Sequence, residues 1–425
     1  MKPVYIASAA RTPIGKFGGT LAAYTAADLG VIAVRAALQR AFGELPAERV
    51  AVENPDWNAT PRFSRDAASK QRTTSYRVGE VIAGNARPAG VGPNLARQIA
   101  WRSGLGDDVP AFTVNMACAS GLRAILLGCQ QIQCGEAEIV VAAGTESMSR
   151  VPYLADTRWG FKLGHQPLVD AMYRDGLFCQ ISKMIMGETA EVLSAQYQIS
   201  REEQDAYALE SQRRAAAAAQ ENRFDAEIIP IEQAAPKGGT IRIDRDEHVR
   251  PETSLESLRK LPPVFAKSGT ITAGNASGIT DGAAAVVLVS EEQLREMKIT
   301  PLARIVGAAI AAVDPRIMGI GPVPAVEKLQ HSTGWALDAY DAIELNEAFA
   351  AQVLACDREL HFDRARLNPN GGAIALGHPI GCTGVRIVTT LLHELRSGSA
   401  KPGRRGLATL CVSGGLGAAL ALETC

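Results

Sequence analysis

Two distant parts of this chain share one order of elements. Between Cys118 and Gly135, a turn of small residues that carries a reactive side chain leads into a helical pattern, and a buried strand follows. The stretch from Gly377 to Gly398 repeats this order. Because a repeated unit predicts a repeated structure, the sequence predicts two similar α/β halves, with residues 149–277 inserted between them as a loop domain.

Local patterns give the positions of several elements. Residues 3–15, 78–86 and 138–149 have the apolar character of buried strands that end in turns. Residues 27–42 have apolar side chains at helical spacing, and Ser200 with Glu203 forms a capping-box signature for a helix that follows. Residues 51–77 are polar, basic and aperiodic, which predicts a surface insertion.

The composition limits the class of protein. With 425 residues, 47% hydrophobic and 21% charged, the chain can bury a large core. A net charge of −1 gives no general attraction to nucleic acid or to an anionic membrane. The eight cysteines form no CxxC pair and no zinc-binding pattern, and the amino terminus does not look like a signal peptide. We therefore expect a soluble cytoplasmic enzyme with free thiols, without a metal or redox cofactor, and without nucleic-acid or membrane partners.

Four residues could carry chemistry. Cys118 begins a helical stretch, where backbone N–H groups and the helix dipole are expected to lower the thiol pKa. His378 lies in a glycine-rich turn and could activate a thiol. Cys411 precedes another glycine turn and could act as an acid or base, and Asn346 could hold a water or donate to an oxyanion. Taken alone, the cysteines are also compatible with core packing, His378 with a turn and Asn346 with a helix cap.

Taken together, the motifs around these residues resemble the thiolase family. They are NMACASG, NEAFA, GGAIALGHPIGCTG and CVSGGLG, supported by ARTPIGKFGG, MGETAE, GTITAGNASGITDGAAA and DPRIMGIGP. The resemblance covers nearly the whole chain except residues 51–77. It implies two α/β halves stacked as five alternating α/β/α/β/α layers. The N-terminal half would comprise residues 1–148 and 278–290, the coenzyme A-binding loop domain 149–277, and the C-terminal half 291–425.

The resemblance also implies roles for the four residues. Cys118 would be acylated by the first acyl-CoA after activation by His378. Cys411 would take a proton from the methyl group of acetyl-CoA, and the resulting enolate would attack the acyl-enzyme. His378 and a water held by Asn346 would stabilise the enolate oxygen, while the backbone N–H groups of Cys118 and Ser413 would stabilise the tetrahedral intermediate.

Coenzyme A binding is the other property that the resemblance implies. The expected contacts are Leu177, Met186, Arg250, Ser257, Ala273, Ser277, Met318 and Phe349. Three positions depart from common family patterns: Ala119 and Ser413 replace glycines, and Ile185 stands where many acetyl-specific members have histidine. The serine adds a side chain near the pocket, and the isoleucine removes a polar group near the pantetheine.

Several functions follow from the resemblance. The chain could be an acetyl-CoA acetyltransferase or a 3-ketoacyl-CoA thiolase of fatty-acid degradation with a preference for longer chains. A ketosynthase would normally lack the second cysteine, so Cys411 argues against that class. A scaffold that binds coenzyme A without turnover is the non-enzymatic alternative. By the same resemblance we expect a homodimer or homotetramer.

Overall fold

The computed structural model describes residues 2–50, 74–235, 238–398 and 401–425. Most of the predicted insertion at 51–77 therefore lies outside the described residues. The first elements are β1 Val4–Arg11, β2 Gly15–Lys16, α1 Ala26–Phe42, β3 Glu80–Gly84, α3 Leu95–Arg102, β4 Ala111–Val114, the 3₁₀ helix η2 Ala117–Ala119, α4 Ser120–Cys134 and β5 Ile139–Ser147. The strands and the helix predicted in this region are confirmed.

The last part of the chain repeats this series. Its elements are β12 Thr280–Ser290, α8 Glu291–Met297, β13 Ala303–Ala312, η5 Pro315–Ile320, α9 Pro322–Thr333, η6 Leu337–Ala339, β14 Ala342–Leu345, α10 Ala350–Leu360, α11 Ala373–Leu376, α12 Ile380–Leu395, β15 Arg405–Val412 and β16 Leu416–Thr424. The predicted order of turn, helix and strand after Gly377 is confirmed, with the short helix α11 just before that turn.

The strands pair in the same order in both halves. In the first half the order is β4-β3-β5-β12-β1, and in the second it is β14-β15-β16-β13. Toward the outer end the pairs are parallel, β4 with β3 and β3 with β5 in the first half and β14 with β15 in the second, and the pairs that follow are antiparallel. A short pairing of Val4–Ile6 with Ala303–Ile305 joins the two half-sheets.

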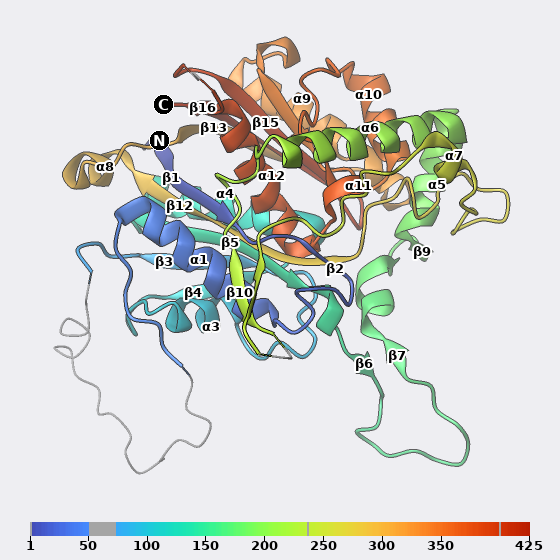
Figure 1. Cartoon of the computed structure of the whole chain (residues 1–425), viewed down its shortest axis with the longest axis horizontal. Helices are drawn as coiled ribbons and strands as arrows, with labels where there is room; N and C mark the ends of the chain where they lie inside the picture. Colours follow the sequence, from blue (N-terminus) through green and yellow to red (C-terminus); the bar gives the residue numbers. More distant parts are fainter. Residues whose placement is uncertain (1, 51–73, 236–237, 399–400) are drawn as a thin grey trace.

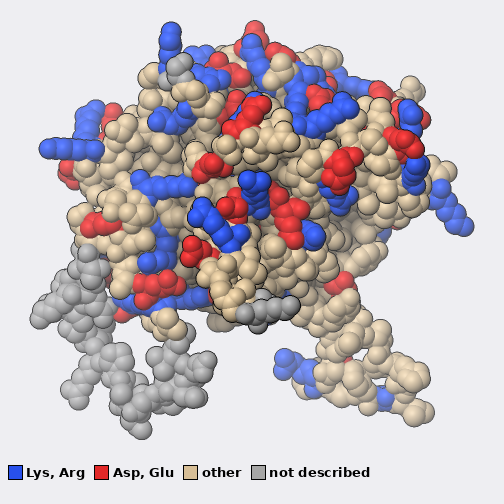
Figure 2. Space-filling model, in the orientation of Figure 1, with Lys and Arg blue, Asp and Glu red and all other residues tan. Residues whose placement is uncertain are grey.

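The segment between β5 and β12 leaves this core. It contains η3 Met148–Arg150, β6 Tyr153–Leu154, β7 Val169–Asp170, η4 Tyr173–Leu177, β8 Phe178–Cys179, β9 Met184–Ile185, α5 Met186–Gln196, α6 Arg201–Gln220, β10 Ile231–Ala234, β11 Thr240–Ile243 and α7 Leu255–Arg259. Ser200 caps α6 with the predicted capping box. The β6–β7 hairpin projects from the body as an arm (residues 153–170), on which Figure 2 shows few charged side chains.

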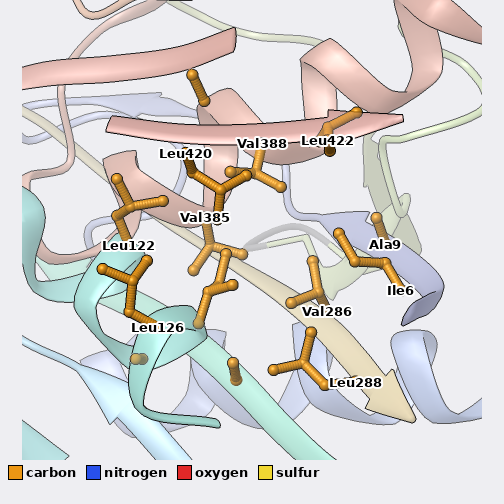
Figure 3. Close-up of a cluster of buried hydrophobic side chains, with 14 of the residues drawn as sticks. Ile6, Ala9, Leu122, Leu126, Val286, Leu288, Val385, Val388, Leu420 and Leu422 are labelled. Carbon is orange, nitrogen blue, oxygen red and sulfur yellow. The ribbon is translucent and has the colours of Figure 1, made fainter. Parts of the chain in front are cut away.

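Helices α4 and α12 form the layer between the two half-sheets (Figure 1). Side chains of β12 alternate between two cores, because successive strand residues point to opposite faces. Val286 and Leu288 pack with Val385 of α12 (Figure 3), whereas Val287 and Val289 face α1 and α3. On the other outer side, α9 and α10 pack on the second half-sheet. The five-layer prediction is thus confirmed.

Glycines bring the two central helices into close contact. A Cβ on Gly121 of α4 would lie 2.8 Å from the carbonyl oxygen of Gly381 on α12, and a Cβ on Gly384 would clash with Leu122. The glycines of the two motifs therefore serve the packing of α4 on α12. Since Cys118 and His378 lie just before these helices, this packing also sets where the two side chains lie.

Within the described residues, no helix has the length and apolar character needed to cross a membrane.

Candidate active site

A tight backbone turn presents Cys118. Strand β4 ends at Val114, and Ala117 then adopts a left-handed conformation with φ of 45°. The Asn115 side chain accepts a hydrogen bond from Ala117 N at 2.9 Å, and Ser120 Oγ donates to the Ala117 carbonyl at 2.7 Å. A left-handed alanine costs about 1–3 kcal/mol, and such strain is found where the surrounding structure holds a functional residue in place.

Two backbone N–H groups surround the Cys118 sulfur, from Cys118 itself and from Ser413 in the β15–β16 turn. Burial nevertheless raises the pKa of the Cys118 thiol above its usual value, although these hydrogen bonds and the Arg87 charge oppose the rise. The prediction of a lowered pKa is therefore wrong in sign for the free protein. Removal of the sulfur from water outweighs the stabilisation available at the helix start, so Cys118 needs a base.

His378 can be that base. Its Nδ1 lies 2.6 Å from Thr383 Oγ1, and the Thr383 hydroxyl donates its proton to the Pro379 carbonyl at 3.0 Å. The threonine oxygen must then accept from Nδ1–H, which leaves Nε2 as the basic nitrogen. Burial, with the Arg386 and Arg87 charges, lowers the pKa of His378 to about 3. The imidazole is thus neutral, and its Nε2 has no partner among the described residues.

Cys411 and Asn346 lie side by side at the ends of β15 and β14. Asn346 N donates to the carbonyl of Thr409, two residues before Cys411. Burial raises the pKa of Cys411 well above its usual value, and the nearby Cys118 adds to this effect. The Asn346 side chain is fully buried, and neither of its polar atoms has a partner in the described part of the chain. Helix capping by Asn346 is excluded, because the N-cap of α10 is Phe349.

A cavity of about 500 Å³ leads from the surface to His378. Most of the coenzyme A contacts implied by the sequence line it: Leu177, Met186, Arg250, Ala273, Ser277 and Phe349. Met318 is buried behind Met186 and Phe349, in the same cluster as Cys411. Ser257 lies outside the lining, at the start of α7, where it bonds to Ser254.

Further residues that were not predicted from the sequence also line the cavity, Lys16, Phe17 and His248 among them. Lys16 and Phe17 belong to the quoted stretch ARTPIGKFGG and line the cavity, as does His248, whose Nδ1 lies 3.1 Å from the Ala375 carbonyl. The position of Lys16 and Phe17 inside a matched motif was the signal that could have identified them. His248 carried no such signal. Among the described residues, no group of three or more His, Cys, Asp or Glu is placed to hold a metal ion.

Comparisons with known proteins agree with this geometry. Residues 62–292 match the model "Thiolase, N-terminal domain", and residues 299–424 match "Thiolase, C-terminal domain". An acetyl-CoA acetyltransferase of Pseudomonas aeruginosa is 46% identical over 423 residues, which is 99% of either chain.

Solved structures are similar over the same length. The acetyl-CoA acetyltransferase of Bacillus anthracis superposes with a TM-score of 0.89 at 42% identity, covering 100% of this chain and 99% of that one. Human mitochondrial 3-ketoacyl-CoA thiolase in complex with CoA gives 0.87 at 42% identity, covering 100% and 98%. The similarity thus extends to proteins of both names at equal identity.

Proposed function

Because this chain belongs to the thiolase family, we propose that it is an acetyl-CoA acetyltransferase, which interconverts two acetyl-CoA with acetoacetyl-CoA and coenzyme A. One observation carries this proposal. The basic nitrogen of His378, which lines an apolar cavity, and the buried Asn346 amide have no partner among the described residues. Buried polar groups are normally paired, so these two are available to a substrate.

In the cleavage direction, the first stage forms the acyl-enzyme. His378 Nε2 accepts the Cys118 proton, and the sulfur attacks the ketone carbon of acetoacetyl-CoA. The bond between that carbon and the next breaks, and its electron pair leaves as the enolate of acetyl-CoA. The enolate carbon takes the thiol proton of Cys411. The imidazolium and a water on Asn346 stabilise the enolate oxygen.

The second stage regenerates the free enzyme. The Cys411 thiolate takes the proton of coenzyme A, whose sulfur attacks the acetyl–Cys118 thioester. The backbone N–H groups of Cys118 and Ser413, which surround the sulfur in the free protein, stabilise the tetrahedral oxyanion. Acetyl-CoA leaves, and Cys118 recovers its proton from His378. Every proton returns to its starting group, and condensation follows the same steps in reverse.

The cavity suits coenzyme A in its shape and its lining. Phe17, Val264 and Ile279 are exposed apolar side chains that line it, and they offer contacts for the adenine or the pantetheine. Lys16 and Arg250 supply positive charge for the phosphates. Residues 149–277 would therefore be the coenzyme A-binding loop domain of the expected three-part division.

The experiment that tests the function is thiolysis of 3-ketoacyl-CoA substrates of increasing chain length by purified protein with free coenzyme A. Acetoacetyl-CoA is expected to react best. Folded protein that cleaves none of the substrates but still binds coenzyme A would contradict the proposal and favour a binding scaffold.

One observation favours a second candidate, a 3-ketoacyl-CoA thiolase for longer chains. Ile185 is one of the apolar residues that line the cavity, together with Leu177, Val264 and Phe349. A preference for long substrates in the same series would support this candidate. Replacing Ile185 with His would then shift the preference toward acetoacetyl-CoA.

We also propose that the chain forms homo-oligomers through the arm. Trp159 is 91% exposed, Leu168 is 68% exposed and Leu163 is fully exposed. Several exposed apolar side chains on one projecting hairpin are typical of an interface. Replacing Trp159 and Leu163 with Ser is expected to lower the mass measured by light scattering, and an unchanged mass would contradict this assignment.

A cytoplasmic location remains a proposal, supported by eight free cysteines.

A further inference from the structure

Glu146 is a fully buried carboxylate beside the site that the chemistry above does not use. It lies at the end of β5, and each of its oxygens accepts two hydrogen bonds. Oε1 accepts from Asn85 Nδ2 at 2.7 Å and from Arg87 N at 3.1 Å, and Oε2 accepts from Ala86 N at 3.0 Å and from Gly381 N at 2.8 Å. An ionised carboxylate has about four acceptor positions, so these donors fill them.

The four donors come from two parts of the molecule. Asn85, Ala86 and Arg87 follow β3 in the first half, whereas Gly381 lies in the first turn of α12, three residues after His378. Glu146 therefore ties the start of α12 to the first half-sheet. Gly381 also contacts Gly121 of α4, so the same bond fixes the packing of the helix that follows Cys118.

The segments that Glu146 holds also contact the nucleophile. Ala86 and Ile380 belong to the buried cluster that packs against Cys118, and Ile380 lines the substrate cavity. The carboxylate also acts on the thiol electrostatically: burial is the largest cause of the raised pKa of Cys118, Arg87 lowers this pKa, and the negative charge of Glu146 adds a smaller rise. The other titratable groups at the site include His378 and Cys411, and Lys16, His248 and Arg250 line the cavity.

We propose that Glu146 is a positioning residue for acyl transfer, which holds the His378 turn against the Cys118 turn across the boundary between the two halves. This proposal rests on the proposed function, because it names the residue that holds the proposed catalytic groups in place. It needs a carboxylate, because four donors converge and an amide NH₂ in place of one oxygen would face N–H groups. A displacement on the order of 1 Å between nucleophile and base can cost about 10²-fold in rate.

The test compares Glu146→Gln with Glu227→Gln. Glu227 is an equally buried carboxylate in an ion pair with Arg11, and it is not among the residues that line the cavity. Thiolysis is normalised to the amount of Cys118 that forms an acyl-enzyme, so unfolded protein does not count. We expect kcat of E146Q to fall about 10²-fold with the KM for coenzyme A nearly unchanged. E227Q should melt at a lower temperature and keep its normalised kcat.

A second readout does not depend on turnover. The rate at which iodoacetamide alkylates Cys118, measured on its peptide by mass spectrometry, is followed against pH. Loss of the negative charge should move the E146Q profile to lower pH, although turnover is slower. A variant that lost stability alone would keep the wild-type profile.

Three outcomes would overturn the inference: an unchanged normalised kcat, a change confined to KM, or an unchanged alkylation profile. If the wild-type protein catalyses no thiolysis, the proposed function is refuted instead. The alkylation profiles would then still test whether Glu146 acts on Cys118. If E146Q does not fold, Glu146→Asp takes its place. That variant keeps the charge but is one methylene shorter, and we expect kcat to fall about tenfold at constant KM.

Discussion

Equivalent strand ends of the two halves carry different chemistry. Gly84 of β3 pairs with Gly144 of β5, and Leu345 of β14 pairs with Thr409 of β15. An asparagine follows each first strand, Asn85 and Asn346. On the neighbouring strands, Glu146 lies two residues after Gly144, and Cys411 lies two residues after Thr409. The pair Asn85–Glu146 thus occupies in the first half the place of Asn346–Cys411 in the second.

The two pairs differ in how their polar atoms are used. Asn85 Nδ2 donates to Glu146 and to the Thr145 carbonyl. The Asn346 amide has no partner within the described residues, and Cys411 is a buried thiol with a raised pKa. A filled network is rigid, whereas an unfilled one can accept a substrate. For these strand-end residues, the comparison predicts that Asn85 and Glu146 support the site, whereas Asn346 and Cys411 meet the substrate. The predictions below test this division.

The largest effect is expected at Cys118, the proposed nucleophile, which lies in η2 after β4 in the first half and outside both strand-end pairs. Replacing Cys118 with Ala should lower the thiolysis rate by on the order of 10⁴-fold or more, because no acyl-enzyme can form. Steady-state cleavage of acetoacetyl-CoA measures this. Cys134→Ser is the matched control, since Cys134 is an exposed cysteine at the end of α4, the helix that follows Cys118. Comparable losses in both variants would refute the assignment.

The substitution Cys411→Ser tests the pair Asn346–Cys411 directly. Turnover should fall by about 10²–10⁴-fold, the range of general acid–base catalysis. Cys118 should still be acetylated by labelled acetyl-CoA, because that step does not need the second cysteine. Cys382→Ala, which removes another buried thiol, is expected to retain turnover. Loss of acetylation in C411S would show that the two cysteines are not divided by role.

Asn85 and Asn346, which occupy equivalent positions in the two halves, provide the sharpest comparison. Asn346→Ala should lower kcat by about 10²-fold, through loss of the water that stabilises the enolate. Its melting temperature should change little, because no hydrogen bond among the described residues is lost. Asn85→Ala should instead lower the free energy of unfolding by about 1–3 kcal/mol, with a smaller effect on kcat. Denaturant unfolding and steady-state kinetics on both variants measure these effects. If the two variants lose kcat and stability equally, the two asparagines do not have different roles.

The smallest effect is a pH dependence of stability. His378 has a pKa of about 3 in the folded protein, against about 6.5 when unfolded. The unfolded chain binds more protons between these values, so this residue's contribution to stability is complete above about pH 6.5 and is lost as pH falls toward 3. Its slope is at most about 1.4 kcal/mol per pH unit. In His378→Asn, unfolding experiments should show a shallower loss over this window, and an unchanged slope would mean that His378 is not buried neutral.

Much of the fold could be predicted from the sequence, because its signals are local. Short apolar runs, the capping box at Ser200 and the glycine turns each specify a strand, a helix start or a bend within a few positions. The four candidate catalytic residues were predicted in the same way, since each lies in a short motif. Glu146 was missed because its partner Gly381 lies 235 positions away, and no local pattern contains that contact.

By itself, the sequence determined the family, the two-half α/β architecture and the identity of Cys118, His378, Cys411 and Asn346. The tertiary structure decided their states. It reversed the expected pKa shift of Cys118, set the basic nitrogen of His378, and excluded Asn346 as a helix cap. These properties depend on burial and on neighbours from distant segments, and the free energy of a charge or a hydrogen bond is fixed only when those neighbours are in place.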